Sequence, residues 1–162
     1  MEQLNSKFLD DHRQMEQCDF RFFFKEKTRW GDADTLGHIN NVMYARYYES
    51  TRVAYFEQLL GLQFVSKMPV GVITADMGIS YLEQLHYPAE MIIGARVSRI
   101  GKSSFSFDSA IFVGENTKPV STSRTTQVWF DFEQNQSKEI PCEVRTKMIE
   151  YEIIAPLQSQ KT

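Results

Sequence analysis

Residues 42–60 constrain the fold most strongly, because their pattern predicts a long helix that is apolar around most of its circumference. The apolar positions are Tyr44, Tyr47, Tyr48, Tyr55, Phe56, Leu59 and Leu60. Asn40 or Asn41 can cap the first turn, and Gly61 provides a stop at the C-terminal end. A helix of this kind has to be buried on most sides. A sheet curled around the helix would bury it.

Alternation with a period of two predicts five strands in the rest of the chain. One precedes the helix and four follow it, at residues 19–30, 70–82, 91–100, 104–113 and 120–132. Consecutive strands joined by short turns pair in antiparallel fashion. Pro141 then precedes a short amphipathic segment, which predicts a terminal helix at 143–151. This order indicates an α+β fold in which an antiparallel sheet wraps around the long helix.

Length, charge and cysteine content exclude several classes of protein. The 162 residues correspond to one domain, and the net charge of −3 argues against a nucleic-acid partner. Cys18 and Cys142 form no CxxC pair, so we expect reduced thiols and no structural zinc. Residues 1–10 hold no apolar core of a signal peptide, and no apolar run reaches the roughly 18 residues that span a bilayer. We therefore expect a cytoplasmic protein that does not insert into a membrane.

The loop before the long helix holds three titratable residues, Asp32, Asp34 and His38. The first N–H groups of a helix are unpaired and carry partial positive charge, so they can stabilise an oxyanion. The amides of Ile39 to Asn41 would polarise a thioester carbonyl. Asp34 would then activate water as a general base or attack the carbonyl itself.

The same loop also has a structural explanation. Asp and Asn are common in loops and at helix N-caps, because their side chains bond nearby amides. A lone histidine such as His38 more often bonds within a loop than takes part in catalysis. His12 and His86 show no partner pattern, and the sequence has no metal-binding spacing such as HExxH. We therefore expect neither a metal nor a cofactor.

A dense motif connects this loop to the helix. The stretch WGDADTLGHINNVMY starts at Trp30 and is followed on the helix by Tyr47, Tyr48, Glu49 and Arg52. It resembles the signature of the 4-hydroxybenzoyl-CoA thioesterase-like hotdog family, in which D-x-D-x-x-G precedes a helix that carries Tyr and Glu-x-x-Arg. The resemblance implies a five-stranded antiparallel sheet around the helix at 42–60. We expect this domain at 19–155, after an N-terminal arm at 1–18 and before a tail at 156–162.

The resemblance also implies roles for residues of the loop. Asp34 falls on the family's catalytic carboxylate, and Gly37 falls on the glycine that turns the chain toward the helix. The amide near Asn41 falls on the donor that polarises the carbonyl. Some branches of the family use a histidine in this loop, so His38 is implied as an assisting residue.

One basic residue lies at the end of the third strand from the start of the chain, and a second lies just beyond it. In the family, such residues near the third-to-fourth strand connection meet the phosphates of CoA, so Arg99 and Lys102 are candidates for CoA binding. The alternative is that both are ordinary solvated charges of a turn. Members of the family commonly form dimers that join two sheets and place the active site between subunits, and a tetramer can be built from such dimers. We therefore expect a homodimer or a tetramer.

The implied reaction is hydrolysis of an acyl-CoA to a free carboxylic acid and CoA, without a metal or redox cofactor. One alternative is an acyl-ACP thioesterase of the same fold. A second alternative is a non-catalytic acyl-CoA-binding hotdog protein, although a binding protein has no need for a carboxylate directed at the carbonyl. A hotdog hydratase would carry a different His-containing signature, which is absent from this sequence.

Overall fold

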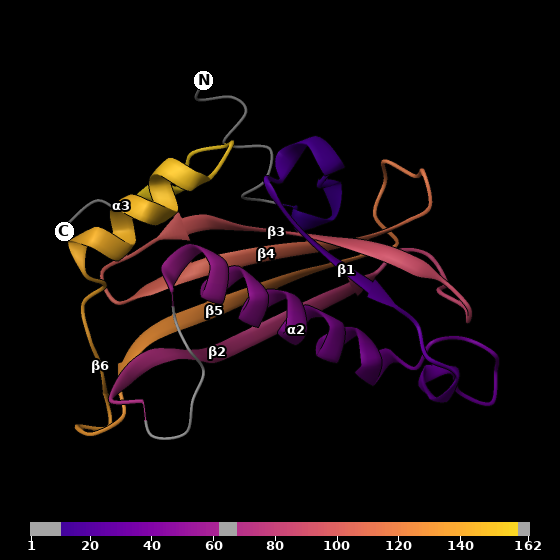
Figure 1. Cartoon of the computed structure of the whole chain (residues 1–162), viewed down its shortest axis with the longest axis horizontal. Helices are drawn as coiled ribbons and strands as arrows, with labels where there is room; N and C mark the ends of the chain where they lie inside the picture. Colours follow the sequence, from indigo (N-terminus) through magenta and orange to yellow (C-terminus); the bar gives the residue numbers. More distant parts are fainter. Residues whose placement is uncertain (1–10, 62–67, 159–162) are drawn as a thin grey trace.

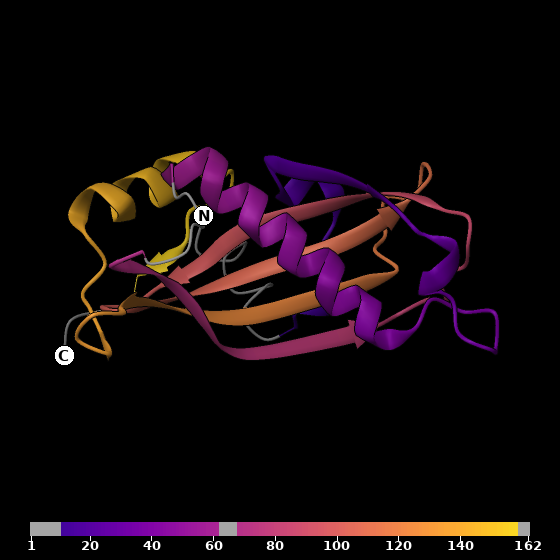
Figure 2. The same cartoon turned by 60° about the horizontal axis from the view of Figure 1, so that its bottom comes forward.

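Five long strands form an antiparallel sheet, and helix α2 lies across its concave face (Figures 1 and 2). The structure is a computed structural model that describes residues 11–61 and 68–158. The strands are β1 (Phe22–Lys27), β2 (Val70–Tyr81), β3 (Glu90–Ile100), β4 (Ser104–Val113) and β5 (Ser121–Asp131). Their order across the sheet is β1-β3-β4-β5-β2. The α+β hotdog fold expected from the sequence is therefore confirmed.

Helix α2 spans Asn41–Leu60, close to the predicted 42–60. Of the two candidate caps, Asn40 is the one used, because its side-chain Oδ1 accepts the N–H of Val42 at 3.1 Å. Gly61 ends the helix in the left-handed region, with φ of 65°. That conformation is strained for other residues and costs glycine little.

The core beneath α2 consists of two apolar clusters. Tyr55 and Phe56, on the C-terminal half of the helix, pack with Phe105, Phe107 and Trp129. Residues of the N-terminal half pack with the start of β3 and the connection that precedes it, and the members of this cluster include Tyr44, Tyr47, Tyr48, Leu85, Met91 and Ile93. Apolar side chains from both halves of the helix are thus buried, as the apolar pattern of its sequence predicted.

The first strand is shorter than predicted, at Phe22–Lys27 instead of 19–30. Residues Gln17–Asp19 form a 3-10 turn, η2, in which the Asp19 side chain accepts the N–H of Glu16 at 2.7 Å. This side-chain bond competes with extension of the strand. A similar turn, η1, spans His12–Gln14, within the arm expected at 1–18, and residues 1–10 of that arm lie outside the described residues.

Two strands of two residues were not predicted. Strand β6 (Gln136–Ser137) pairs with β5. Strand β7 (Leu157–Gln158), within the expected tail, pairs in parallel with β3 at Arg99 and Ile100. The terminal helix α3 spans Cys142–Tyr151, as expected. No helix among the described residues is long and apolar enough to cross a membrane.

Candidate active site

Asp32 anchors the loop between β1 and α2. Its carboxylate is buried and accepts two hydrogen bonds at Oδ2, from the hydroxyl of Tyr47 at 2.5 Å and from the N–H of Arg29 at 2.8 Å. Its carbonyl accepts the N–H of Asn40 at 2.8 Å. Burial and the bond to Asp32 hold the pKa of Tyr47 well above its usual range, so this hydroxyl remains a donor. Asp32 therefore ties both ends of the loop to the helix.

Within that frame, residues 33–39 fold back on themselves. Ala33 and Ile39 form an antiparallel bridge. Inside it, the N–H of Asp34 donates to the carbonyl of His38 at 2.8 Å. Gly37 has φ of 80°, and its N–H donates to the carbonyl of Asp34 at 3.1 Å. The positive φ explains why glycine occupies this turn toward the helix.

The two oxygens of the Asp34 carboxylate differ. Oδ1 accepts the N–H of Leu36 at 2.8 Å and that of His38 at 3.4 Å, which is the local bonding that the structural explanation of this loop predicts. No residue of the described chain donates to Oδ2. The side chain is partly exposed. One oxygen is thus held by the loop and the other is open to a ligand or water.

The backbone amides before α2 are not equivalent donors, and this corrects the expectation for two of them. The N–H of Ile39 donates to the carbonyl of Leu85 at 2.8 Å, and that of Asn40 donates to Asp32. These two amides hold the loop and are not available to an oxyanion. The N–H of Asn41 has no acceptor within residues 11–61 and 68–158. It is the amide at the helix N-terminus that can meet a developing negative charge.

His86 contacts this loop, although the sequence indicated no partner for it. Its ring nitrogen Nδ1 lies 3.0 Å from the carbonyl oxygen of Gly37. Its ring also meets that of His38 edge-on, with 5.0 Å between the ring centroids. Because 49 positions separate His86 from Gly37, no local pattern in the sequence relates them.

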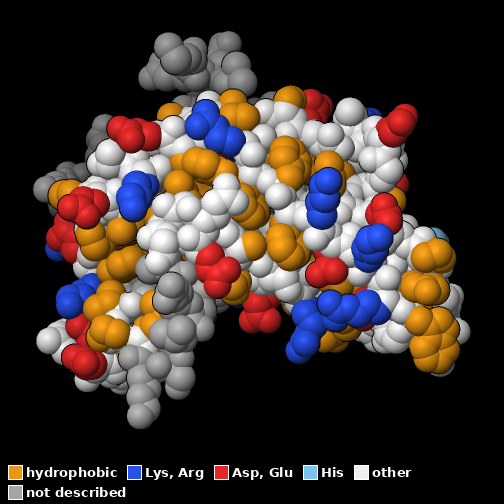
Figure 3. All heavy atoms as spheres, viewed as in Figure 1, with side chains coloured by type: hydrophobic (Ala, Val, Ile, Leu, Met, Phe, Trp, Pro, Cys, Tyr) orange, Lys and Arg blue, Asp and Glu red, His pale blue; other side chains and the backbone are white. Residues whose placement is uncertain are grey.

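Apolar side chains surround the loop at the surface. Trp30, Leu36 and Val42 are 82%, 78% and 67% exposed, and Tyr81 is also exposed. Figure 3 shows hydrophobic side chains gathered on the part of the surface that Figure 1 assigns to this loop. Exposed apolar groups in such density are typical of a surface that a ligand or a second protein covers.

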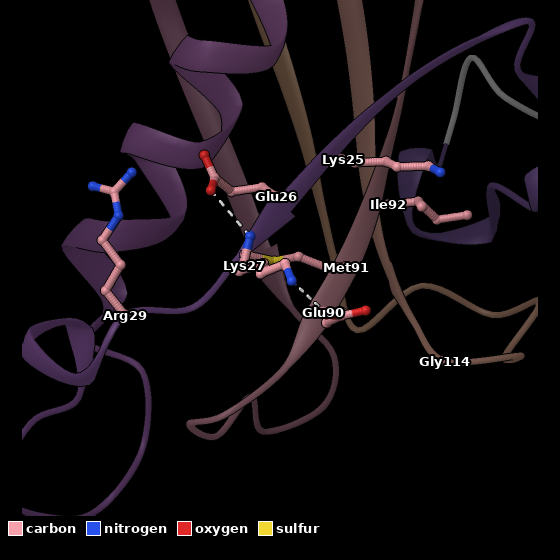
Figure 4. Close-up of a pocket in the computed structure, with 8 residues that line it drawn as sticks. All are labelled: Lys25, Glu26, Lys27, Arg29, Glu90, Met91, Ile92 and Gly114. Carbon is pink, nitrogen blue, oxygen red and sulfur yellow. Dashed lines mark hydrogen bonds and ion pairs between the residues drawn. The ribbon is translucent and has the colours of Figure 1, made fainter.

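A groove of about 650 Å³ lies beside β1, and its charged side chains are Lys25, Glu26, Lys27, Arg29 and Glu90. Lys27 and Glu90 pair at 2.6 Å, and both are exposed. Figure 4 shows Lys25 and Glu26 directed to opposite sides of the strand. None of the site residues predicted from the sequence lines this groove.

Arg99 and Lys102 lie far from the loop within one chain. The loop follows β1, whose last residue Lys27 pairs with Glu90, the first residue of β3. Arg99 is near the other end of β3 and Lys102 is in the turn beyond it. Ten residue steps separate the two ends of this strand, about 33 Å at roughly 3.3 Å per residue. One subunit therefore does not bring these cations to Asp34. Figure 1 shows the loop before α2 and the turn after β3 at opposite ends of the sheet.

The described residues contain no group of three or more His, Cys, Asp or Glu side chains placed to hold a metal ion. Arg99 borders a small hollow of about 290 Å³ together with the hydroxyl-bearing residues Ser104, Ser106 and Thr126.

The chain is similar in sequence to a family of thioesterases and to individual proteins. The profile of the Thioesterase-like superfamily matches residues 28–148. The YsmA protein of Bacillus subtilis (strain 168) is 31% identical over 109 residues, which cover 67% of this chain and 71% of that protein. The chloroplastic acyl-acyl carrier protein thioesterase ATL3 of Arabidopsis thaliana is 24% identical over 126 residues, covering 77% of this chain and 66% of that protein.

A solved structure shares the fold. The thioesterase of Thermus thermophilus, complexed with coenzyme A and Zn, superposes with a TM-score of 0.71 at 23% sequence identity. The superposition covers 83% of this chain and 96% of that chain.

Proposed function

Because this chain belongs to the thioesterase-like superfamily, we propose that it hydrolyses an acyl-CoA to a free carboxylic acid and CoA, with Asp34 as the reacting carboxylate. One observation carries the proposal. A single loop presents Oδ2 of Asp34 and leads into a helix that begins with the amide of Asn41, and neither group has a hydrogen-bond partner among the described residues. Acyl transfer needs such a pair, an activating base or nucleophile and a donor to the carbonyl oxygen.

In the proposed reaction, the N–H of Asn41 polarises the thioester carbonyl. By the first route, Oδ2 of Asp34 takes a proton from water as the water oxygen attacks the carbonyl carbon. The C–S bond then breaks, and the CoA thiolate takes up a proton. By the second route, Oδ2 attacks the carbonyl carbon and the C–S bond breaks, so that an anhydride forms and the CoA thiolate leaves and takes up a proton; water then hydrolyses the anhydride to the carboxylic acid and free Asp34. Incorporation of ¹⁸O from labelled water into Asp34 in a single turnover would identify the second route.

His38 and Gly37 have supporting roles in this proposal. Gly37 provides the turn that directs the chain to α2. His38 is partly buried, and its N–H faces Oδ1 of Asp34. We propose that its side chain assists Asp34 in the reaction.

The cations proposed to bind CoA act from a second subunit. Strand β2 is an edge strand of the sheet and pairs only with β5 among the described strands. Its last residue, Tyr81, donates its hydroxyl to the carbonyl of Asn41 at 3.3 Å, so this end of β2 is at the site. Its first residue, Val70, pairs with Asp131, at the end of the sheet where the β3–β4 turn lies. Antiparallel pairing of two β2 strands would bring the partner copy's β3–β4 turn toward this Asp34.

A homodimer of this kind unites Asp34 of one copy with Arg99 and Lys102 of the other. The cations would meet the phosphates of CoA, for which Arg and Lys are suited. The exposed apolar residues around the loop would then border the acyl chain at the subunit interface. Two free and exposed cysteines, Cys18 and Cys142, support a reducing compartment such as the cytoplasm.

A second candidate function is hydrolysis of an acyl-ACP. The similarity to the acyl-ACP thioesterase ATL3 supports it. Matched acyl-CoA and acyl-ACP substrates that carry the same acyl group would distinguish the two carriers by their kcat/KM values.

The central experiment is a hydrolysis screen over short, medium, long and aromatic acyl-CoAs, with Asp34→Asn as the test of the site. The Asn side chain keeps an oxygen that can accept from Leu36 and His38, so the loop should retain its shape. We expect kcat to fall about 100-fold or more, because a base or nucleophile is lost, while KM changes little. Near-normal turnover by this variant would contradict the role of Asp34. Tight acyl-CoA binding without turnover by the unaltered protein would contradict the enzyme itself.

A further inference from the structure

The connection between β2 and β3 contacts residues 33–39 of the loop before α2 at two points. The carbonyl of Leu85 accepts the N–H of Ile39 at 2.8 Å. One residue further along the connection, Nδ1 of His86 lies 3.0 Å from the carbonyl oxygen of Gly37. The two contacts involve adjacent residues of the connection and residues two positions apart on the loop, and together they form a short clamp.

The contact to Gly37 indicates which ring nitrogen of His86 carries a hydrogen. A carbonyl oxygen can only accept a hydrogen bond, so Nδ1 of His86 must carry the hydrogen. The neutral ring is then the tautomer that has a bare Nε2. His86 is therefore a donor to the loop, and this is its one side-chain hydrogen bond within residues 11–61 and 68–158.

The carbonyl that His86 holds belongs to the same peptide group as an amide that faces Asp34. The peptide between Gly37 and His38 accepts from His86 at its oxygen, and its N–H lies 3.4 Å from Oδ1 of Asp34. A peptide group is planar, so rotation that displaces the oxygen also displaces the N–H. Donation to the carbonyl also strengthens the N–H as a donor, because hydrogen bonds in a chain polarise one another.

We propose that His86 is a positioning residue for Asp34. It fixes the plane of the Gly37–His38 peptide and thereby orients the carboxylate so that Oδ2 points to the reacting carbonyl. The proposal rests on the proposed function of Asp34. His86 is exposed and touches a backbone oxygen, so its role is to position the loop.

The rest of the loop does not depend on this bond. The bridge between Ala33 and Ile39, the bond from Ile39 to Leu85 and the buried carboxylate of Asp32 all remain when the ring is replaced. Variants at this exposed position should therefore fold, and their effect should fall on the orientation of Asp34.

Two substitutions separate the two ring nitrogens. In His86→Asn, the side-chain Nδ2 can take the place of Nδ1 and donate to Gly37. In His86→Gln, the amide nitrogen reaches the place of Nε2, and the donor to Gly37 is lost. We expect kcat to fall about tenfold in the Gln variant, the usual effect of one lost hydrogen bond, with KM within about twofold of the unaltered value. The Asn variant should retain more than half of kcat.

His12→Gln is the matched control, because His12 contacts Ser80 on the opposite side of the sheet from α2 and should leave kcat unchanged. Equal kcat values for the Asn and Gln variants at position 86 would overturn the proposal. So would a loss in the Gln variant that appears only in KM.

A readout without substrate separates this proposal from the proposed function. The exchange rate of the His38 amide with deuterated water should rise in the Gln variant and stay near the unaltered value in the Asn variant. The ¹⁵N spectrum of the imidazoles at pH 8 should show a protonated Nδ1 for the signals that vanish in both variants. A protonated Nε2, or an unchanged exchange rate in the Gln variant, would overturn the positioning role even if Asp34 is confirmed. If no thioester is hydrolysed but both spectroscopic results appear, the proposed function is contradicted and the contact of His86 with the loop is confirmed.

Discussion

Asp32 and Asp34 are two positions apart and have opposite environments. Asp32 is 5% exposed, and its Oδ2 accepts from the hydroxyl of Tyr47 and the amide of Arg29. Asp34 is partly exposed, and within the described part of the chain only its Oδ1 accepts hydrogen bonds. A fully bonded carboxylate supports the loop, whereas a half-bonded one can react. This difference is why Asp34, and not Asp32, is proposed to carry the chemistry.

The supporting role of Asp32 predicts a loss of stability in Tyr47→Phe. The variant removes one of two donors to a buried carboxylate, which should lower the free energy of unfolding by about 1–3 kcal/mol. Urea unfolding would measure the change. Tyr87→Phe, at an exposed tyrosine, is the control and should change the free energy by less than about 0.5 kcal/mol. Equal stability of the two variants would show that the bond to Asp32 contributes nothing.

At the scale of elements, Glu152 joins three of them directly after α3. Its Oε1 accepts from the hydroxyl of Tyr55 on α2 and from the N–H of Val97 on β3, the latter at 2.8 Å. The side chain is buried. Burial raises the pKa of Glu152 to about 7, and the bonds from Tyr55 and Val97 oppose this rise in part. The folded protein therefore keeps this carboxyl protonated at pH values where the unfolded chain has lost the proton.

This linkage predicts that Glu152 lowers stability as the pH rises. Between pH 4.5 and about 7 the folded state binds more protons here than the unfolded state, so the free energy of unfolding falls with pH. The shift corresponds to a loss of about 2–3 kcal/mol between pH 5 and pH 8. Glu152→Gln removes the titrating group, so its stability should fall less over the same range. Urea unfolding of both proteins at pH 5 and pH 8 gives the comparison, and parallel pH dependences would contradict the raised pKa.

At the scale of the whole molecule, the proposed site is incomplete in one chain. The loop after β1, which holds Asp34, and the end of β3, where Arg99 and Lys102 lie, are at opposite ends of the sheet. Strand β2 has one edge that pairs with no other described strand, and this edge provides a way to join two sheets, with each copy completing the other's site. In such a dimer, each site would depend on residues of both chains.

Mixed dimers should recover activity from two defective chains. Asp34→Asn chains should be inactive, and chains with Arg99→Glu and Lys102→Glu should show KM for acyl-CoA raised about tenfold or more, since charged contacts to phosphate are reversed. In a mixed dimer, one of the two sites combines Asp34 of the charge-reversed chain with Arg99 and Lys102 of the Asp34→Asn chain. This site is intact, so coexpression should produce activity with a normal KM. The matched control is an S-acyl-pantetheine, which lacks the nucleotide and should show no such effect. If coexpression restores no low-KM activity, the cations do not act across the interface.

The sequence by itself determined the elements and the chemical character of the loop. The helix at Asn41–Leu60 and five strands follow from periodicity, which depends only on neighbours along the chain. The short 3-10 turns and the strands at Gln136–Ser137 and Leu157–Gln158 were missed, since side-chain bonds and pairing with distant residues produce them. The motif around Asp34 was also visible, because all its residues lie within one loop.

Only the tertiary structure decided which groups of that loop remain available. The amides of Ile39 and Asn40 were equivalent to that of Asn41 in the sequence, yet contacts with Leu85 and Asp32 occupy them. The sequence indicated no partner for His86, which contacts Gly37 because the β2–β3 connection lies against the loop. Hydrogen-bond donors and acceptors are saturated by whichever groups the fold brings near, and the sequence does not encode that proximity locally. Composition therefore indicates which chemistry a loop can carry, whereas packing selects the atoms that can perform it.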